Sequence, residues 1–280
     1  MNRKSVAMTT YNGEKYIKEQ LMSILTQTVP ANEIIICDDC SKDNTVNIIE
    51  KIVKENTTMT EIKLYRNKSN LGYIKNFYQA ISLTKGDYIF LSDQDDIWHL
   101  DKIEKMSTIM QQMNCTALCT NFNLVNSEGV LINDKGQFKL NPFINKVKEL
   151  LTPIKFSNLI FGNISQGCTY CFSKQVKDAY LQINSNQLIH DHQIMFIASL
   201  LGDVYFLNEN LIDYRLHNKN AIGFNKKNTA TKIKFKKPVL KPFMVQFLDD
   251  VDKEIPIPYK VFYKMLYYLR LPYFVSKIRN

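Results

Sequence analysis

Three carboxylates, Asp93, Asp95 and Asp96, fall close together in the sequence. They follow an apolar run, residues 88–91, that is typical of a short buried strand. Carboxylates at this spacing repel one another unless a cation lies between them, and a divalent ion is the usual one. Because side chains two positions apart in an extended chain point to the same side, Asp93 and Asp95 can face one ligand while Asp96 faces away. The alternative is a solvated acidic turn that opens the next helix.

The cysteines offer a second candidate for a metal. Cys37 and Cys40 are spaced C-x-x-C, and so are Cys168 and Cys171. Both pairs lie in or beside predicted strands, where a separation of three positions puts the two side chains on opposite faces. Zinc ligands must converge, so the pattern favours ordinary core residues in a reducing compartment over a zinc site.

The composition indicates a folded protein with a basic end. The chain has 280 residues, of which 45% are hydrophobic and 11% aromatic, and this excludes a disordered chain. The length suits one large α/β domain with or without an appendage. Residues 226–280 carry 13 Lys and Arg against 4 Asp and Glu, so the whole net charge of +9 belongs to this tail.

The beginning of the sequence is basic, but its apolar run ends at Thr9 and is too short for a signal-peptide core. No apolar run has the length needed to span a bilayer. We therefore expect a protein in the cytoplasm.

Strand and helix patterns alternate up to the acidic motif. Apolar runs predict strands over 5–10, 33–37, 62–65 and 88–91, and apolar residues at helical spacing predict helices around 14–27, 48–53 and 74–81. This alternation predicts an α/β fold with a parallel, doubly wound sheet. Ligands bind such sheets at the carboxyl ends of the strands, where the acidic motif falls.

The pattern changes after residue 98. The sequence predicts a helix over 97–113, a strand over 116–125, a connecting region over 131–158, a strand over 166–173, a helix over 188–201, and strands over 204–207 and 211–216. The late helix opens with His190-Asp191-His192, and the last strand leads to His217. No internal repeat or low-complexity tract is present.

Four motifs together resemble the family 2 inverting glycosyltransferases. They are Thr9-Thr-Tyr11-Asn-Gly13, the turn over 38–45, Asn70-Leu-Gly72 with Asn76, and Ser92-Asp93-Gln-Asp95-Asp96. The resemblance covers about residues 3–223 and implies the glycosyltransferase A fold, a mostly parallel nucleotide-binding sheet flanked by helices. Together with the segment 214–220, the form Ser-Asp-Gln-Asp-Asp-Ile-Trp looks most like bacterial rhamnosyltransferases.

The resemblance implies a metal site at the acidic motif. Asp93 and Asp95 match the family's Asp-any-Asp motif, which holds the metal and the ribose or diphosphate of the donor, with Asp95 as the chief ligand. Mg²⁺ or Mn²⁺ neutralises the charge of the leaving diphosphate. His217 can reach the metal or the diphosphate, and a surface histidine is the alternative.

The resemblance also implies a pocket for the donor. Thr9, Tyr11 and Asp39 match the base-binding residues, where Tyr11 can stack on a pyrimidine and Asp39 can accept from its ring N–H. Asn76 is expected in the same cleft, and a mid-helix Asn facing water is the alternative. Trp98 can stack on an acceptor sugar or cover the core.

Asp191 matches the family's catalytic base, which stands at the start of a late helix. Inversion needs a carboxylate on the acceptor side that takes the proton of the attacking hydroxyl. The family often has Glu-Asp where this chain has His190-Asp191, so the role of the residue before the base is open. A helix N-cap is the alternative for Asp191.

The tail mixes cations with aromatic side chains, which suits the headgroup layer of an anionic membrane. The alternative is a helical pair packed on the domain. Nucleic-acid binding would also use a basic tail, but it is not expected because no recognition module accompanies the basic residues.

We expect a metal-dependent inverting glycosyltransferase that acts at the inner face of the cell membrane. Its donor would be a dTDP- or UDP-sugar, with dTDP-rhamnose as the first candidate, and its acceptor a cell-surface or lipid-linked glycan. Residues 1–225 would form the catalytic domain, with a nucleotide-sugar half over 1–98 and an acceptor half over 99–225, and 226–280 would be an extension. The alternatives are a UDP-hexose or UDP-N-acetylhexosamine transferase and a catalytically silent glycan-binding protein.

Overall fold

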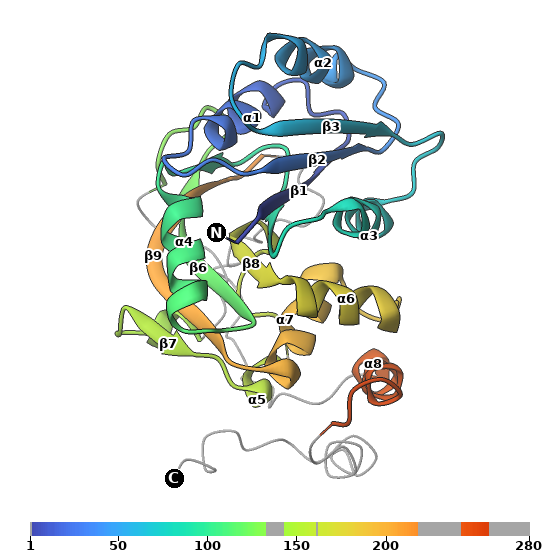
Figure 1. The fold of residues 1–280 in the computed structure, drawn as a ribbon, viewed down its shortest axis with the longest axis vertical. Helices are drawn as coiled ribbons and strands as arrows, with labels where there is room; N and C mark the ends of the chain where they lie inside the picture. Colours follow the sequence, from blue (N-terminus) through green and yellow to red (C-terminus); the bar gives the residue numbers. More distant parts are fainter. Residues whose placement is uncertain (1, 133–142, 161, 218–241, 258–280) are drawn as a thin grey trace, which may run out of the picture.

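The structure is a computed structural model that describes residues 2–132, 143–160, 162–217 and 242–257 (Figure 1). Its centre is a mixed sheet of nine strands flanked by helices, so the predicted α/β class is confirmed. Eight strands follow the order β3-β2-β1-β4-β8-β6-β9-β5, and β7 pairs with β9.

The first half of the chain supplies the parallel part of the sheet. Its elements are β1 (Lys4–Thr10), α1 (Ile17–Leu25), β2 (Glu33–Asp38), α2 (Thr45–Glu55), β3 (Glu61–Arg66), α3 (Tyr73–Leu83) and β4 (Tyr88–Ser92). β1 pairs in parallel with both β2 and β4, and β3 pairs in parallel with β2. α1 and α2 cover one face of these strands and α3 covers the other, as a doubly wound sheet requires (Figure 1).

The second half extends the sheet with strands of both directions. Its elements are β5 (Ile97–Trp98), α4 (Lys102–Gln112), β6 (Ala117–Val125), η2 (Ile144–Lys146), β7 (Leu151–Pro153), α5 (Phe156–Leu159), η3 (Gly167–Thr169), β8 (Tyr170–Ser173), α6 (Lys174–Ile183), α7 (His190–Leu201), β9 (Val204–Arg215) and α8 (Pro242–Asp252). β8 runs antiparallel between β4 and β6, and so joins the two halves of the sheet.

The helix predicted over 97–113 is wrong at its beginning. Ile97 and Trp98 form β5, which pairs antiparallel with β9, and α4 begins only at Lys102. The strand predicted over 166–173 is also shorter, because η3 precedes β8. The two predicted last strands are one strand, β9, and α6 had no predicted counterpart. The differences at β5 and β9 depend on pairing with segments far away in the sequence.

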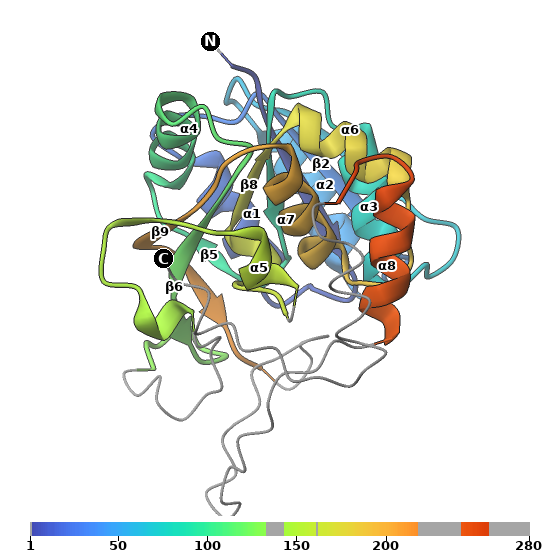
Figure 2. The ribbon, with the colours of Figure 1, turned by 90° about the horizontal axis from the view of Figure 1, so that it is seen from below.

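Two apolar layers form one continuous core around the sheet. All six residues of β2 are buried, and α1 packs its apolar stripe into the same core through residues such as Ile17 and Leu21. α8 joins this core on the α6–α7 side (Figure 2), where Phe247 packs edge-on against Phe196 at 5.2 Å between ring centroids. In the described ranges, none of the helices is both long and apolar enough to cross a membrane.

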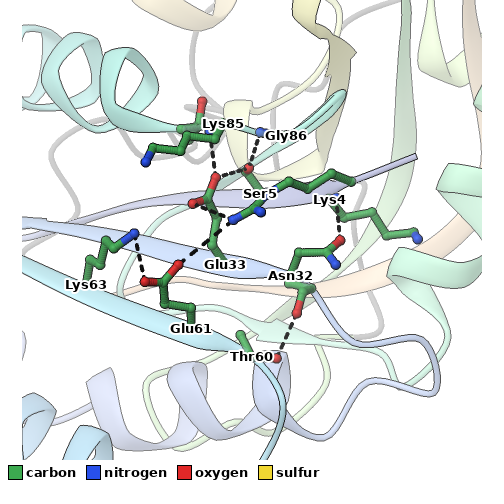
Figure 3. Close-up of polar contacts among 12 residues, drawn as sticks. Lys4, Ser5, Asn32, Glu33, Thr60, Glu61, Lys63, Lys85 and Gly86 are labelled. Atoms are coloured by element: carbon green, nitrogen blue, oxygen red, sulfur yellow. Dashed lines mark hydrogen bonds and ion pairs between the residues drawn. The ribbon is translucent and has the colours of Figure 1, made fainter. Parts of the chain in front are cut away.

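The amino ends of the strands are closed by a buried carboxylate (Figure 3). Glu33 accepts hydrogen bonds from Ser5 Oγ and the Lys85 backbone N–H, both at 2.5 Å, and Arg3 reaches it at 3.3 Å. These contacts join β1, β2 and the turn before β4. A buried carboxylate with this many donors is structural, and the opposite, carboxyl ends of the strands remain available for a site.

Candidate active site

A pocket of about 350 Å³ lies at the carboxyl ends of β1, β2 and β4, facing the first turns of α3 and α7. Of the eight site residues that the sequence predicts, seven line it: Thr9, Tyr11, Asp39, Asn76, Asp93, Asp95 and Asp191. His217 does not line the pocket but contacts Asp95, which does. The structure therefore brings the predicted residues together, and their individual roles stay predictions.

Asp95 and His217 form a close pair at one wall of the pocket. The Nε2 atom of His217 lies 2.7 Å from Oδ2 of Asp95, and its ring stacks on Tyr16 with 4.9 Å between centroids. The side chain of His217 is only 10% exposed, so the surface-histidine alternative is wrong. Carboxylate and imidazole are both donors that a divalent cation accepts.

Asp96 lies beneath the pocket rather than in it. It is buried, and its Oδ1 accepts the Arg215 backbone N–H at 3.0 Å. Asp93, Asp96 and Cys168 place one potential metal-ligating atom each within 4.8 Å of one another. Burial and then the neighbouring carboxylates raise the pKa of both Asp93 and Asp96, that of Asp96 to about 7. The solvated-turn alternative is therefore wrong for Asp95 and Asp96, and Asp93 is itself partly buried.

Two buried cationic residues that the sequence did not single out lie near the acidic motif. Lys102 is fully buried, donates from Nζ to the Cys168 carbonyl at 2.5 Å and lies 4.0 Å from the centroid of the Trp98 ring. Burial lowers its pKa to about 8, against the attraction of the nearby acidic groups. Trp98 is accordingly a core residue with 3% exposure, and the alternative of an acceptor platform is wrong.

Arg215 is the second of these residues. Its Nε donates to the Asp95 carbonyl at 2.8 Å, and its guanidinium pairs with Glu19 of α1 at 2.5 Å. It thereby ties the acidic loop to α1 while its side chain is only 2% exposed. An arginine two positions before a predicted site histidine was the available signal in the sequence, but its partners are 120 and 196 positions away.

Asp39 and Asn76 organise the loop before α3. Asp39 accepts from the backbone N–H groups of Leu71 and Gly72 at 2.7 and 2.8 Å, and from Asn67 at 2.9 Å. The Nδ2 of Asn76 donates to the Cys37 carbonyl at 2.8 Å, and the side chain is buried, so the water-facing alternative is wrong. These bonds tie the carboxyl end of β2 to the start of α3. This wall of the pocket is therefore fixed, because its two elements cannot move independently.

Asp191 stands in the first turn of α7, whose N-cap is Ile189, so the N-cap alternative for Asp191 is wrong. It is 6% exposed and accepts the His192 backbone N–H at 2.7 Å. Burial raises its pKa to about 7. Gly167 packs directly on it, since a Cβ there would lie 3.1 Å from the Cβ of Asp191. A side chain at 167 would therefore push against the predicted base.

His190, next to the predicted base, is an uncharged wall of the pocket. Its ring stacks on Phe77 with 4.0 Å between centroids and meets Tyr73 edge-on. Burial lowers its pKa to about 3, so it is neutral at physiological pH. The only carboxylate in the described part of this first helical turn is Asp191.

The raised pKa of Asp191 predicts how activity depends on pH. A base must be deprotonated to accept a proton, and below its pKa the carboxyl already carries one. We expect kcat/KM of sugar transfer to rise about tenfold per pH unit below pH 7 and to level off above it, measured between pH 5 and 9 at saturating Mg²⁺. A profile that is flat from pH 5 to 7 would contradict this assignment of the base.

Three of the four cysteines in the two C-x-x-C pairs are core residues. Cys37, Cys168 and Cys171 are buried in the core, whereas Cys40 lies in the loop after β2. Burial raises the pKa of the Cys37 thiol to about 12 and those of Cys168 and Cys171 well above the usual range. These thiols are protonated, which is the state of inert core residues.

Comparison with known proteins identifies the family of the chain. The sequence pattern of glycosyl transferase family 2 matches residues 5–173. The dTDP-rhamnosyl transferase RfbG of Shigella flexneri is 31% identical over 229 residues, which are 78% of this chain and 74% of the relative. The putative teichuronic acid biosynthesis glycosyltransferase TuaG of Bacillus subtilis (strain 168) is 29% identical over 82% of this chain and 85% of its own length.

A similar fold occurs in S. aureus TarS, residues 1–349, in complex with UDP-GlcNAc. The TM-score is 0.65 at 18% sequence identity, with 95% of this chain and 70% of that chain covered. The same TarS fragment in another crystal structure is covered over 60% of its length, at a TM-score of 0.59. At this identity the likeness establishes the fold alone. Family pattern, relatives and fold agree: the chain belongs to glycosyl transferase family 2, a family of inverting glycosyltransferases, and has the glycosyltransferase A fold.

Proposed function

We propose that this chain transfers a sugar from a nucleotide diphosphate donor to a hydroxyl group of a cell-surface glycan, with Mg²⁺ or Mn²⁺ as cofactor. The observation that carries the proposal is the shared pocket: the pair Asp93 and Asp95 and the buried carboxyl of Asp191 line one cavity. A group that binds a charged leaving group and a group that accepts a proton are both required for inversion.

The donor base would bind between the loops after β1 and β2. Tyr11 is 46% exposed at the pocket, so its ring is available for stacking on a pyrimidine. Thr9 and Asp39 line the same end. Because Oδ1 of Asp39 already accepts two hydrogen bonds and Oδ2 accepts one, Oδ2 is the atom that would accept from the ring N–H of the base.

The diphosphate would lie at the acidic motif. The part of the pocket lining that the structure describes contains Asp39, Asp93, Asp95 and Asp191 and neither Lys nor Arg. A diphosphate would be repelled there unless a cation were bound as well. Asp93 and Asp95 would supply the carboxylate oxygens that Mg²⁺ and Mn²⁺ prefer, and His217, beside Asp95, would offer a nitrogen donor as well. When bound, the ion would neutralise the charge that develops on the leaving diphosphate.

Asp191 would act as the base in a single displacement. The acceptor oxygen forms a bond to the anomeric carbon while the bond from that carbon to the diphosphate oxygen breaks. The electron pair of the broken bond leaves with the nucleotide diphosphate, and the hydroxyl proton passes to the carboxylate of Asp191. A pKa of about 7 makes this carboxylate a much better proton acceptor than an ordinary Asp while it stays largely ionised above neutral pH.

The first candidate donor is dTDP-rhamnose. The motifs resemble bacterial rhamnosyltransferases, and a relative at 31% identity is named a dTDP-rhamnosyl transferase. UDP-hexose and UDP-N-acetylhexosamine are the alternative donors, which the fold shared with a UDP-GlcNAc complex supports. A catalytically silent glycan-binding protein is the alternative from another class, and the placement of Asp191 beside the acidic motif argues against it.

A donor panel tests the proposal. We expect dTDP-rhamnose with Mn²⁺ to raise the melting temperature most among dTDP-, UDP- and GDP-sugars, and to be hydrolysed slowly by the protein alone. The shift should fall sharply with EDTA, because the diphosphate then has no counter-cation. A UDP-sugar as the best ligand would favour the alternative donors, and binding without any hydrolysis or transfer would favour the silent protein.

The domain division and the membrane contact are part of the proposal. The catalytic unit would comprise residues 1–225, and the basic tail from 226 would dock on anionic lipid at the inner face of the membrane. Most of this tail lies outside the described residues. Its segment 242–257 contains α8, which packs on the domain through Phe247.

A further inference from the structure

Gln94, which lies between Asp93 and Asp95 in the acidic motif, contacts the loop after β1 on the opposite side of the pocket. Gln94 accepts the Tyr11 backbone N–H at Oε1, at 2.8 Å, and donates from Nε2 to the Tyr11 carbonyl at 3.0 Å. The amide thus satisfies both backbone groups of one residue, as a neighbouring strand would. Gln94 and Tyr11 are 83 positions apart and both line the pocket.

The loop after β1 is shaped to receive this amide. A Cβ at Gly13 would lie 2.2 Å from Oε1 of Gln94, so only glycine allows the two to approach so closely. On its other side the loop is held by Ser41 Oγ, which accepts from the Asn12 N–H at 2.9 Å, and by Thr45 Oγ1, which accepts from the Gly13 N–H at 2.7 Å. These residues hold Asn12 and Gly13, whereas Gln94 holds the backbone of Tyr11 itself.

We propose that Gln94 is a positioning residue that couples the diphosphate end of the pocket to the base end. Ligation at Asp93 and Asp95 would fix the backbone on both sides of Gln94. The hydrogen-bonded amide of Gln94 would then hold the backbone of Tyr11, and with it the ring, in one position. The donor's base and diphosphate would then bind cooperatively, because each fixes a loop that the other also needs. This inference rests on the proposed nucleotide-sugar site.

A double-mutant cycle on nucleotide affinity tests it. The probes are dTDP and UDP, titrated calorimetrically with Mg²⁺ into the wild type, Gln94→Met, Tyr11→Ala and the double variant. We expect Gln94→Met to weaken binding of the tighter probe about fivefold, as the loss of positioning hydrogen bonds would. In the Tyr11→Ala background the same change should weaken binding less than twofold, because the ring that Gln94 positions is gone.

Two controls protect the interpretation. Gln175→Met makes the same exchange at an exposed position on α6 and should leave affinity unchanged. Gln94→Asn is the substitute if Gln94→Met folds poorly, as judged by its melting temperature. Its side chain is too short to reach both backbone groups of Tyr11, so it should show the same loss of nucleotide affinity.

The outcomes separate the inference from the proposed function. Equal losses in both Tyr11 backgrounds would mean that Gln94 supports only the acidic loop, and they would overturn the coupling while leaving the nucleotide site intact. Unchanged affinity in Gln94→Met and Gln94→Asn would overturn it as well. If the wild type binds neither dTDP nor UDP with Mg²⁺, the proposed function and the inference both fail.

Discussion

Replacement of Asp191 by Asn is expected to lower kcat of sugar transfer by about 10²- to 10⁴-fold, the usual contribution of a general base. The amide keeps the shape of the carboxyl and can still accept the His192 N–H, which now bonds Oδ1 at 2.7 Å. It cannot take a proton from the acceptor hydroxyl. Initial rates at saturating donor and acceptor measure the effect, and the affinity for dTDP with Mg²⁺ should stay within twofold of the wild type.

The same variant should be at least as stable as the wild type above neutral pH. The folded-state pKa of Asp191 is raised to about 7, so the carboxyl favours folding most below pH 4 and this contribution is lost as the pH rises through 7. Asn carries no charge to bury and avoids that loss. Asp178→Asn, the same exchange at an exposed position on α6, serves as the control for activity. A kcat within threefold of the wild type in Asp191→Asn would reject Asp191 as the base.

Replacement of Asp95 by Asn is expected to remove the response to Mn²⁺ and to lower kcat by about 10³-fold, since a cation at the leaving group contributes several kcal/mol to the transition state. The side chain of Asp95 faces the pocket and pairs with His217 at 2.7 Å, so its charge is available to a ligand. Its backbone carbonyl, which accepts from Arg215, is unchanged, so the loop should keep its shape. Rates across a Mn²⁺ titration and calorimetric Mn²⁺ binding measure the two effects.

Asp203→Asn is the matched control, because Asp203 is exposed at the turn before β9, away from the pocket lining. It should retain both the rate and the Mn²⁺ response. If Asp95→Asn kept a normal Mn²⁺ response, the ligands would have to be sought in the lower cluster of Asp93, Asp96 and Cys168. Loss of the rate with an intact melting temperature would distinguish a site effect from unfolding.

The first half of the fold could be predicted because its signals are local. Apolar runs such as 33–37 and stripes such as that of α1 give the period of each element directly, and alternation then implies the parallel sheet. The acidic motif could be placed at a strand end for the same reason. The remaining site residues came from the resemblance, which joins motifs from distant parts of the chain.

The second half was predicted less well because its strands owe their form to distant partners. Ile97 and Trp98 have helical neighbours in sequence, yet they form a strand because β9, more than a hundred positions later, offers an open edge. The same strand continues through 208–210, where local composition predicted a break, because β6 pairs with it on both sides of that segment.

The sequence by itself determined which chemical groups are present and which strand ends carry them. Only the tertiary structure decided that His217 meets Asp95, that Arg215 holds the acidic loop, and that burial raises the pKa of Asp191 to about 7. The reason is that a motif fixes the type and spacing of side chains along the chain. Charge state and contacts depend instead on desolvation and on neighbours that folding brings from a hundred or more positions away.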